Sequence, residues 1–222
     1  MYQLFVGLIA EGNTDVRFLK SVIFNSIQDI SGECDSQIDI FDIRQIKVGG
    51  ETFVQKMLEA SRQANSVYGI SVLCIHTDSD APTIQPVMEN KFSPFLAELE
   101  KMDDVEYCKH IVPTIPIQEI ESWMLADREL LKQLINAVGF RDVDLGIEKA
   151  PESYADPKSV IENAISIAMS HQPKKRRDSI TISDLYETLG YRLSLEKLRV
   201  IPSFIHFEAG VRKCFRELGL MR

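Results

Sequence analysis

The segment that most constrains this chain is residues 71–82, which read SVLCIHTDSDAP. An apolar, partly β-branched run leads directly into Asp78 and Asp80, with one residue between the two acids. A buried parallel strand that delivers carboxylates to the carboxyl edge of a sheet has this pattern. The segment therefore predicts a parallel α/β core with acids just beyond the end of a strand.

A second apolar run, residues 4–10, also ends in acids. Glu11 follows it directly, and Gly12 permits a tight turn. Asp15 lies at the start of residues 14–30, whose apolar positions have helical spacing. If this helix starts early, both carboxylates face one side, because residues four apart share a helix face.

Carboxylates that converge in this way repel one another at neutral pH unless a divalent cation compensates them. Ligand sets made only of oxygen suit Mg²⁺ or Mn²⁺ rather than zinc. We therefore expect a Mg²⁺ or Mn²⁺ site that contains Glu11, Asp15, Asp78 and Asp80. The alternative is that these acids only cap helices and turns, which strand-end acids do routinely.

Strands and helices alternate through the first part of the chain. Further strands are expected over residues 37–46, near an edge, and 105–112, with helices over 52–64 and after a loop at 81–90. This alternation predicts a right-handed, mostly parallel four-stranded sheet with helices on both faces. We expect residues 1–127 to form this α/β domain.

Residues 128–222 are expected to form a helical C-terminal extension packed on that domain. Apolar residues with helical spacing predict a helix over 158–170. The pattern over residues 182–220 predicts two short helices separated by a loop at Pro202 and Ser203.

A segment that contains the only tryptophan adds Glu119 and Glu121. On a regular helix these two positions lie about 200° apart, so both reach one metal only if Glu119 lies in the loop before the helix. Otherwise one of them is merely solvated. Trp123 is expected in the core, and His76 is expected to be a strand-end histidine whose hydrogen bonds are satisfied.

Charge is spread unevenly over the 222 residues. Residues 1–150 carry 13 basic and 24 acidic residues, whereas residues 151–222 carry 12 and 9. The net charge of −8 argues against a protein that coats nucleic acid, but the basic second part fits either a phosphate-bearing partner or a solvated face. The run KKRR at 174–177 is likewise either a contact for nucleic acid or a linker.

Several classes of protein do not fit the sequence. No apolar run approaches the roughly 18 residues of a membrane span, and the first residues lack the basic start of a signal, so we expect a cytoplasmic protein without membrane contact. The four cysteines have no Cys-x-x-Cys spacing and are expected to be reduced thiols. Neither nucleotide-binding fingerprint, G-x-x-x-x-G-K-[ST] or G-x-G-x-x-G, occurs.

The order of Glu-Gly after the first strand and Asp-x-Asp after the third resembles the Toprim domain of topoisomerases, primases and OLD-type nucleases. Over nearly the whole chain, the segment PIQEIESWMLAD, a later Asp-Pro-Lys and a terminal Pro-Ser-Phe resemble a small prokaryotic Toprim-like family with no settled function. The resemblance implies that Glu11, Asp78 and Asp80 are metal ligands. Asp15 matches the acid that OLD-type nucleases carry four residues after the first.

The chain also departs from the Toprim pattern. His76 and Thr77 stand where an apolar residue is common, and no lysine unambiguously matches the family's catalytic base. Lys158 is a candidate because it starts a helix, where a lysine opposes the helix dipole and needs another reason, such as phosphate contact. The alternative is an ordinary surface lysine.

The resemblance implies a Mg²⁺- or Mn²⁺-dependent nuclease that hydrolyses phosphodiester bonds of DNA or RNA, DNA being the first expectation. It also allows a partner ATPase in a prokaryotic defence system, and it leaves the oligomeric state open. Water rather than a tyrosine is the expected nucleophile, because no tyrosine after residue 107 lies beside a basic cluster. The alternative is a non-catalytic interaction or regulatory subunit that keeps the Toprim scaffold.

The candidate catalytic residues are Glu11, Asp78, Asp80, Glu121 and Lys158, and the candidate metal ligands are Glu11, Asp15, Asp78, Asp80, Glu119 and Glu121.

Overall fold

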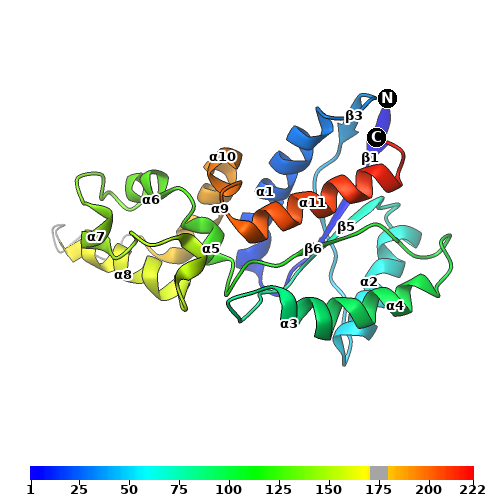
Figure 1. The fold of residues 1–222 in the computed structure, drawn as a ribbon, viewed down its shortest axis with the longest axis horizontal. Coiled ribbons are helices and arrows are strands. Elements are labelled where there is room, and N and C mark those ends of the chain that lie inside the picture. Colours follow the sequence, from blue (N-terminus) through cyan, green and yellow to red (C-terminus); the bar gives the residue numbers. More distant parts are fainter. Residues whose placement is uncertain (171–179) are drawn as a thin grey trace.

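The computed structural model describes residues 1–170 and 180–222, and a four-stranded parallel sheet lies at its centre (Figure 1). The strands run in the order β4-β2-β5-β6, and every neighbouring pair is parallel. Helices flank the sheet, and further helices follow it, so the predicted α/β class is confirmed. The four strands are β2 (Val6–Ile9), β4 (Arg44–Gln45), β5 (Val72–His76) and β6 (Ile111–Thr114).

Two of the predicted strands are interrupted. The first appears as β1 (Tyr2–Leu4) and β2, with Phe5 between them. The strand predicted over 37–46 appears as β3 (Ile38–Ile40), which pairs with β1, and β4, which pairs with β2. Its predicted position at an edge is confirmed, since β4 has only β2 beside it.

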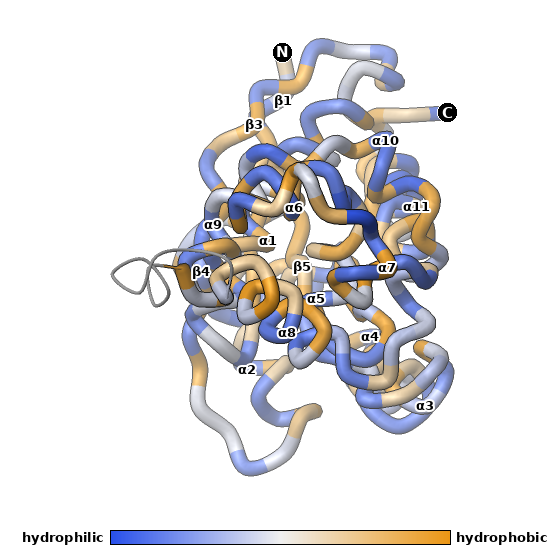
Figure 2. Tube along the Cα trace, turned by 90° about the vertical axis from the view of Figure 1, so that its left-hand side faces the viewer, coloured by the Kyte–Doolittle hydropathy of each residue, from blue (hydrophilic) through white to orange (hydrophobic). Residues whose placement is uncertain are grey.

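Two hydrophobic clusters cover the two faces of the sheet. Successive side chains of a strand point to opposite faces, and along β5 Cys74 joins one cluster while Leu73 and Ile75 join the other. The first cluster packs α1 (Asn13–Ser31) against the sheet, and the second packs α2 (Phe53–Ser66). In Figure 2 the central strand β5 is coloured largely as hydrophobic, whereas the helices around it alternate in character.

The segment between β5 and β6 differs from the prediction at both ends. The loop expected over 81–90 ends early, because a helix begins at α3 (Gln85–Val87), passes through a π-helical turn (Met88–Phe92) and continues as α4 (Ser93–Glu100). The strand expected over 105–112 is wrong for residues 105–110. The side chain of Asp103 accepts a hydrogen bond from the Val105 N–H (2.7 Å) and holds a turn, so β6 starts only at Ile111.

The C-terminal helices complete the core on the α1 face. The longest of them is α11 (Pro202–Glu217), so the loop predicted at Pro202 and Ser203 is wrong: proline is well tolerated at the first position of a helix. In Figure 1, α11 runs across the sheet beside β6. The other elements are α5 (Glu121–Met124), α6 (Arg128–Leu134), α7 (Asp142–Leu145), a 3₁₀ turn (Pro151–Ser153), α8 (Pro157–Ser170), α9 (Ile182–Arg192) and α10 (Leu195–Leu198).

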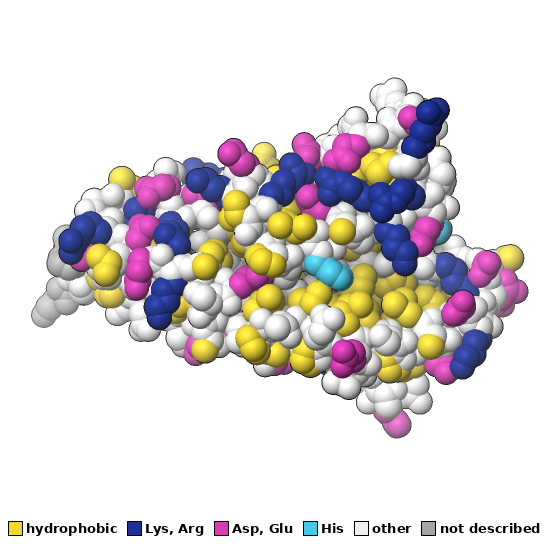
Figure 3. Space-filling view, in the orientation of Figure 1, with side chains coloured by type: hydrophobic (Ala, Val, Ile, Leu, Met, Phe, Trp, Pro, Cys, Tyr) yellow, Lys and Arg dark blue, Asp and Glu magenta, His cyan; other side chains and the backbone are white. Residues whose placement is uncertain are grey.

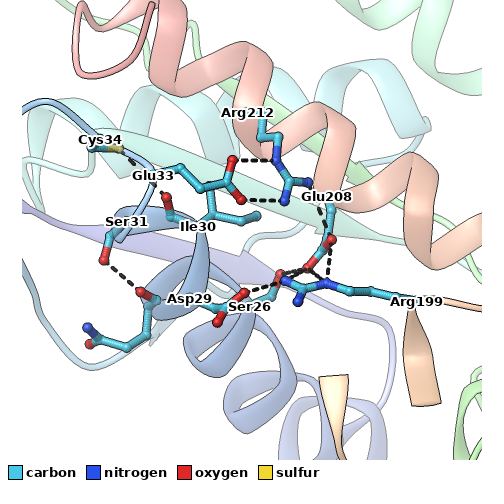
Figure 4. A network of polar contacts seen from close by, with 10 residues as sticks. Ser26, Asp29, Ile30, Ser31, Glu33, Cys34, Arg199, Glu208 and Arg212 are labelled. Atoms are coloured by element: carbon cyan, nitrogen blue, oxygen red, sulfur yellow. Dashed lines mark hydrogen bonds and ion pairs between the residues drawn. The ribbon is translucent and has the colours of Figure 1, made fainter. Parts of the chain in front are cut away.

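A buried carboxylate fastens α11 to α1. Glu208 is only 4% exposed, and it accepts hydrogen bonds from Ser26 (3.0 Å), Arg199 (2.8 Å) and Arg212 (3.3 Å). Figure 4 shows how these side chains converge from α1, α11 and the segment after α10. The division of the chain at residue 127 remains a prediction.

Within the described residues, no helix combines the length and the apolar character that a bilayer crossing requires. The four cysteines are free, as predicted, and three of them are buried.

Candidate functional site

The candidate site lies where the chain changes direction within the sheet. From β2 the chain crosses through α1 to β4 on one side, and from β4 it returns through α2 to β5 on the other side. The carboxyl ends of β2 and β5 therefore flank the crevice in which open α/β sheets bind ligands. Glu11 follows β2 and Asp78 follows β5.

Asp15 closes the first turn of α1 and also faces the crevice. Its Oδ2 accepts a hydrogen bond from the Gly12 N–H (2.9 Å), which is the capping role that the alternative interpretation assigned to it. The same oxygen lies 3.7 Å from His76 Nε2, at the end of β5. A capping role and a role in the site are therefore compatible.

His76 is a buried histidine with one ring nitrogen satisfied. Its Nδ1 lies 3.1 Å from the Thr114 carbonyl oxygen, and because a carbonyl only accepts, Nδ1 carries the proton. Burial lowers the pKa of His76, so the ring is neutral and Nε2 presents a lone pair. This nitrogen lies 3.6 Å from Asp78 Oδ1. The prediction that the hydrogen bonds of His76 are satisfied therefore holds for Nδ1 but not for Nε2.

Asp78 is the most perturbed acid of the site. Burial and the neighbouring carboxylates together raise its pKa to about 8. Its side chain is nevertheless 30% exposed, so an ion or substrate can reach it. The carboxylates that contribute, in decreasing order, are Asp15, Glu121, Glu11 and Glu119.

Glu119 and Glu121 meet the geometric condition set by the sequence. Glu119 lies in the turn before α5, and Glu121 is the first residue of that helix. The Tyr186 hydroxyl, from α9, donates a hydrogen bond to Glu121, and burial together with this carboxylate raises the pKa of Tyr186. The backbone N–H of Lys158, which hydrogen-bonds to Glu119, and then the Lys158 charge oppose the rise that burial causes in the pKa of Glu119, whereas the Lys158 side chain is exposed.

Buried polar atoms without a hydrogen-bond partner concentrate in this region. Among the described residues there are four such side-chain atoms: His76 Nε2, Asp78 Oδ1, Glu119 Oε2 and Ser122 Oγ. All four belong to residues 76–78 and 119–122, the segments that carry the acids. Because buried polar groups are normally paired, such a concentration points to an ion, water or substrate group as the missing partner.

Asp80 does not join the other acids. Its backbone is left-handed (φ 49°), its side chain is exposed, and none of the described residues forms an ion pair with it. Ser79 stabilises this turn instead, because its hydroxyl accepts a hydrogen bond from the Gln118 N–H (2.8 Å). Trp123 is fully buried, as predicted.

Three residues of the site were not predicted. The Thr77 hydroxyl donates to Glu11 Oε1 (3.2 Å) and accepts from Lys91 Nζ (2.9 Å), so a lysine that follows the acids in sequence reaches the site. Tyr186 arrives from a distant helix. Of these three residues, only Lys91 could have been found from the sequence, because the apolar residues Val87 and Phe92 on either side of it are spaced by five instead of the helical three or four.

The described residues contain no ready-formed group of three His, Cys, Asp or Glu side chains for a metal ion. The donor chemistry nevertheless fits a divalent cation. Oxygens of Asp78 and Asp15 lie 3.6 and 3.7 Å from the same atom, His76 Nε2, so the two carboxylates approach one point of the crevice, and oxygen ligands of this kind suit Mg²⁺. Residues 174–177, the other predicted contact for phosphate, lie outside the described residues.

Comparisons of the chain with models of protein families, with curated proteins and with solved structures found no match. Inferences about function therefore depend on the chemistry of the site.

Proposed function

We propose that this chain is a Mg²⁺- or Mn²⁺-dependent phosphodiester hydrolase of the Toprim type that acts on DNA or RNA. The observation that supports it most strongly is the concentration of unpartnered buried polar atoms among convergent carboxylates at the carboxyl end of β5 and in the segment that starts α5. Groups of this kind, held on a rigid sheet edge, are suited to bind a cation together with a phosphate.

The acids of the crevice would act as ligands of the cation. Glu11, Asp15 and Asp78 would hold a cation near β2 and β5, and Glu119 with Glu121 would offer further oxygens on the α5 side. A bound cation lowers the pKa of water and stabilises the charge that develops on a phosphate.

Two other groups would serve the reaction by position. The Thr114 carbonyl fixes the tautomer of His76, so that Nε2 can accept a hydrogen bond from an attacking water. The Tyr186 hydroxyl is bonded to Glu121 and its pKa is raised, which makes it a poor nucleophile and favours attack by water.

Two observations favour the alternative of a non-catalytic interaction subunit. Asp80 is exposed, and the described side chains form no ready-made metal group. In that case the scaffold would bind a partner protein, such as an ATPase, without cleaving nucleic acid.

Cleavage assays on the purified chain separate the two functions. Labelled DNA and RNA, single- and double-stranded, are incubated with Mg²⁺, Mn²⁺ or chelator. We expect metal-dependent cleavage that falls at least a hundredfold in Asp78→Asn and Glu11→Gln, because each removes a cation ligand. Asp104→Asn, which alters an exposed acid paired with Lys109, is the matched control and should keep full activity.

A thermal-shift experiment makes a negative result informative. Mn²⁺ at 100 times its Kd should stabilise the native chain by roughly 2.7 kcal/mol, and Asp78→Asn should lose this shift. Metal binding without cleavage of any substrate would favour the interaction subunit. Cleavage that persists in chelator would contradict the proposed mechanism.

A further inference from the structure

Asp15 and Glu121 lie on one side of the crevice and a set of lysines lies on the other, while Glu11 lines the cleft that holds two of these lysines. Asp15 belongs to α1, and Glu121 contacts α9, which packs on α1. Lys56 and Lys91 belong to α2 and to the π-helical turn, whose neighbours Met57 and Phe92 are buried in the cluster on the opposite face of the sheet. The negative charge of a phosphodiester is repelled by carboxylates and attracted by lysines, so such a substrate would lie against the lysine side.

The π-helical turn is what brings Lys91 to the crevice. The residues that this helix buries are spaced by five, then three, then four positions, and the Ser93 N–H bonds to the Met88 carbonyl five residues back. In a regular helix the residue four after Val87 would point inward, and that residue is Lys91. The extra residue puts Phe92 in the core instead and leaves Lys91 beside it, half-buried. The buried residues of this helix are Val87, Phe92, Phe95 and Leu99.

Pro94 gives this turn a local cause. It has no N–H with which to continue the helical hydrogen bonds, and its ring would clash with the carbonyl four residues before it. A widened turn directly before it removes that clash. π-Helical turns of this kind occur frequently at functional sites.

The contacts of Lys91 leave it able to bind a ligand. Its Nζ donates one hydrogen bond to Thr77 Oγ1 (2.9 Å) and lies 5.9 Å from the centre of the Phe53 ring. No carboxylate among the described residues lies within 4 Å of this ammonium group. Since an ammonium group has three N–H donors, two remain available, and the Thr77 hydroxyl, which donates onward to Glu11, fixes the direction of the third.

A cleft on the other side of Glu11 carries two more lysines. It has a volume of about 250 Å³ and lies between the β2–α1 turn and the segment after β4. Lys47, Lys56 and Asn13 line it together with Glu11, and neither lysine forms an ion pair with any described residue. Two unpaired ammonium groups and a side-chain amide suit the oxygens of a phosphate.

We infer that Lys91, Lys56 and Lys47 form a binding track for the phosphodiester backbone of a nucleic-acid substrate. The backbone passes across Glu11 on the α2 side: Lys91 contacts the phosphate beside the acids, and the cleft of Lys47 and Lys56 holds a neighbouring phosphate. This inference rests on the proposed function for the identity of the substrate. It gives the acidic first part of the chain its own contacts for phosphate, separate from residues 174–177.

Binding measured in chelator tests the track without requiring catalysis. The full chain is titrated into fluorescein-labelled oligonucleotides, single- and double-stranded, and anisotropy is followed at several salt concentrations. Lys91→Ala and Lys56→Ala should each weaken binding about three- to tenfold and flatten the slope of log K against log salt by about 0.7–0.9, one phosphate contact each. Lys91→Arg, which keeps the charge, should retain the slope.

The control is Lys101→Ala on α4. Lys101 is exposed and pairs with Glu98 at 2.6 Å, and its removal should change neither affinity nor slope. Thermal unfolding within a few degrees of the parent confirms that each variant is folded.

The possible failures of the two proposals are distinguishable. A chain that cleaves nucleic acid while both alanine variants bind like the parent overturns the track and leaves the hydrolase intact. A chain that binds through these lysines but never cleaves supports the track and overturns the hydrolase. A parent chain that does not bind any of the oligonucleotides overturns the track directly.

Discussion

At the scale of single residues, the environment of the crevice shifts His76 and Asp78 in opposite directions. Burial disfavours the charged form of both groups, so it lowers the pKa of His76 and raises that of Asp78. Around neutral pH the pair therefore tends toward an uncharged imidazole and a protonated carboxyl group, 3.6 Å apart. A cation that binds Asp78 must displace its proton, which couples metal affinity to pH below about 8.

The free energy of unfolding should fall as pH rises from 6.5 to 8. The folded pKa of Asp78, about 8, exceeds its ordinary value of 3.8, so unfolding releases a proton throughout this range and the contribution is lost as pH approaches 8. Because the side chain is 30% exposed and partly screened, we expect a loss of about 1 kcal/mol. Below pH 6.5 the lowered pKa of His76 acts in the opposite sense, and the two effects oppose each other. The carboxylates facing Asp78 are Asp15, Glu121, Glu11 and Glu119.

Urea unfolding in chelator at pH 6.5 and 8 measures this effect. Asp78→Asn should remove the slope and be more stable than the parent at pH 8, whereas the surface variant Asp104→Asn should keep it. An unchanged slope in Asp78→Asn would assign the dependence to another group.

At the scale of elements, the contact between α1 and α11 depends on one buried acid. Glu208 lies between Arg199 and Arg212, which also pair with Asp29 and Glu33 on and just after α1 (Figure 4). A buried carboxylate with several charged donors is costly to lose, because its partners remain without compensation.

Glu208→Gln should lower the free energy of unfolding by about 2–4 kcal/mol, since it removes the charge shared by the two arginines. Glu217→Gln on the same helix is the matched control. Glu217 is exposed and forms two surface contacts, with Lys213 at 3.6 Å and with His110 at 3.4 Å, so its loss should cost less than about 1 kcal/mol. Equal effects of the two variants in chemical denaturation would show that the buried network adds nothing specific.

The sequence predicts those elements whose apolar residues follow a regular strand or helix pattern. Strand-end acids at Glu11 and Asp78 follow from short apolar runs, and α1 and α2 follow from helical spacing. Long α11 was missed because Pro202 was taken to break a helix that it starts. Tyr186 could not be predicted, since its contact with Glu121 joins residues that are far apart in sequence.

At the scale of the whole molecule, some basic residues of the second part of the chain form ion pairs with acids of the first part. Figure 3 shows basic side chains gathered in a row over α11. Arg212 pairs with Glu33, Arg199 with Asp29, and Arg222 with Asp35. The basic second part of the chain thus compensates acids of the first part, which is a role that the sequence alone had not indicated.

The same packing predicts that the chain unfolds as one cooperative unit. Trp123, the only tryptophan, donates a hydrogen bond to Ser203 (2.7 Å) and packs against Phe204 and Phe207 of α11, although it precedes the predicted domain boundary. Its fluorescence therefore reports on contact with the C-terminal helices, while far-ultraviolet circular dichroism reports on all helices. Under urea the two signals should give the same midpoint and the same m value, as for a two-state domain.

A fragment of residues 1–127 provides the second arm of this test. It lacks α9 and α11, so it would leave exposed the apolar face of α1 and the side of β6 that these helices cover. We expect such a fragment to show no cooperative transition and a tryptophan emission close to that of solvent-exposed indole, because Phe204 and Phe207 are absent. A fragment that unfolds cooperatively, or a full chain whose two signals have separate midpoints, would instead support two domains that meet near residue 127.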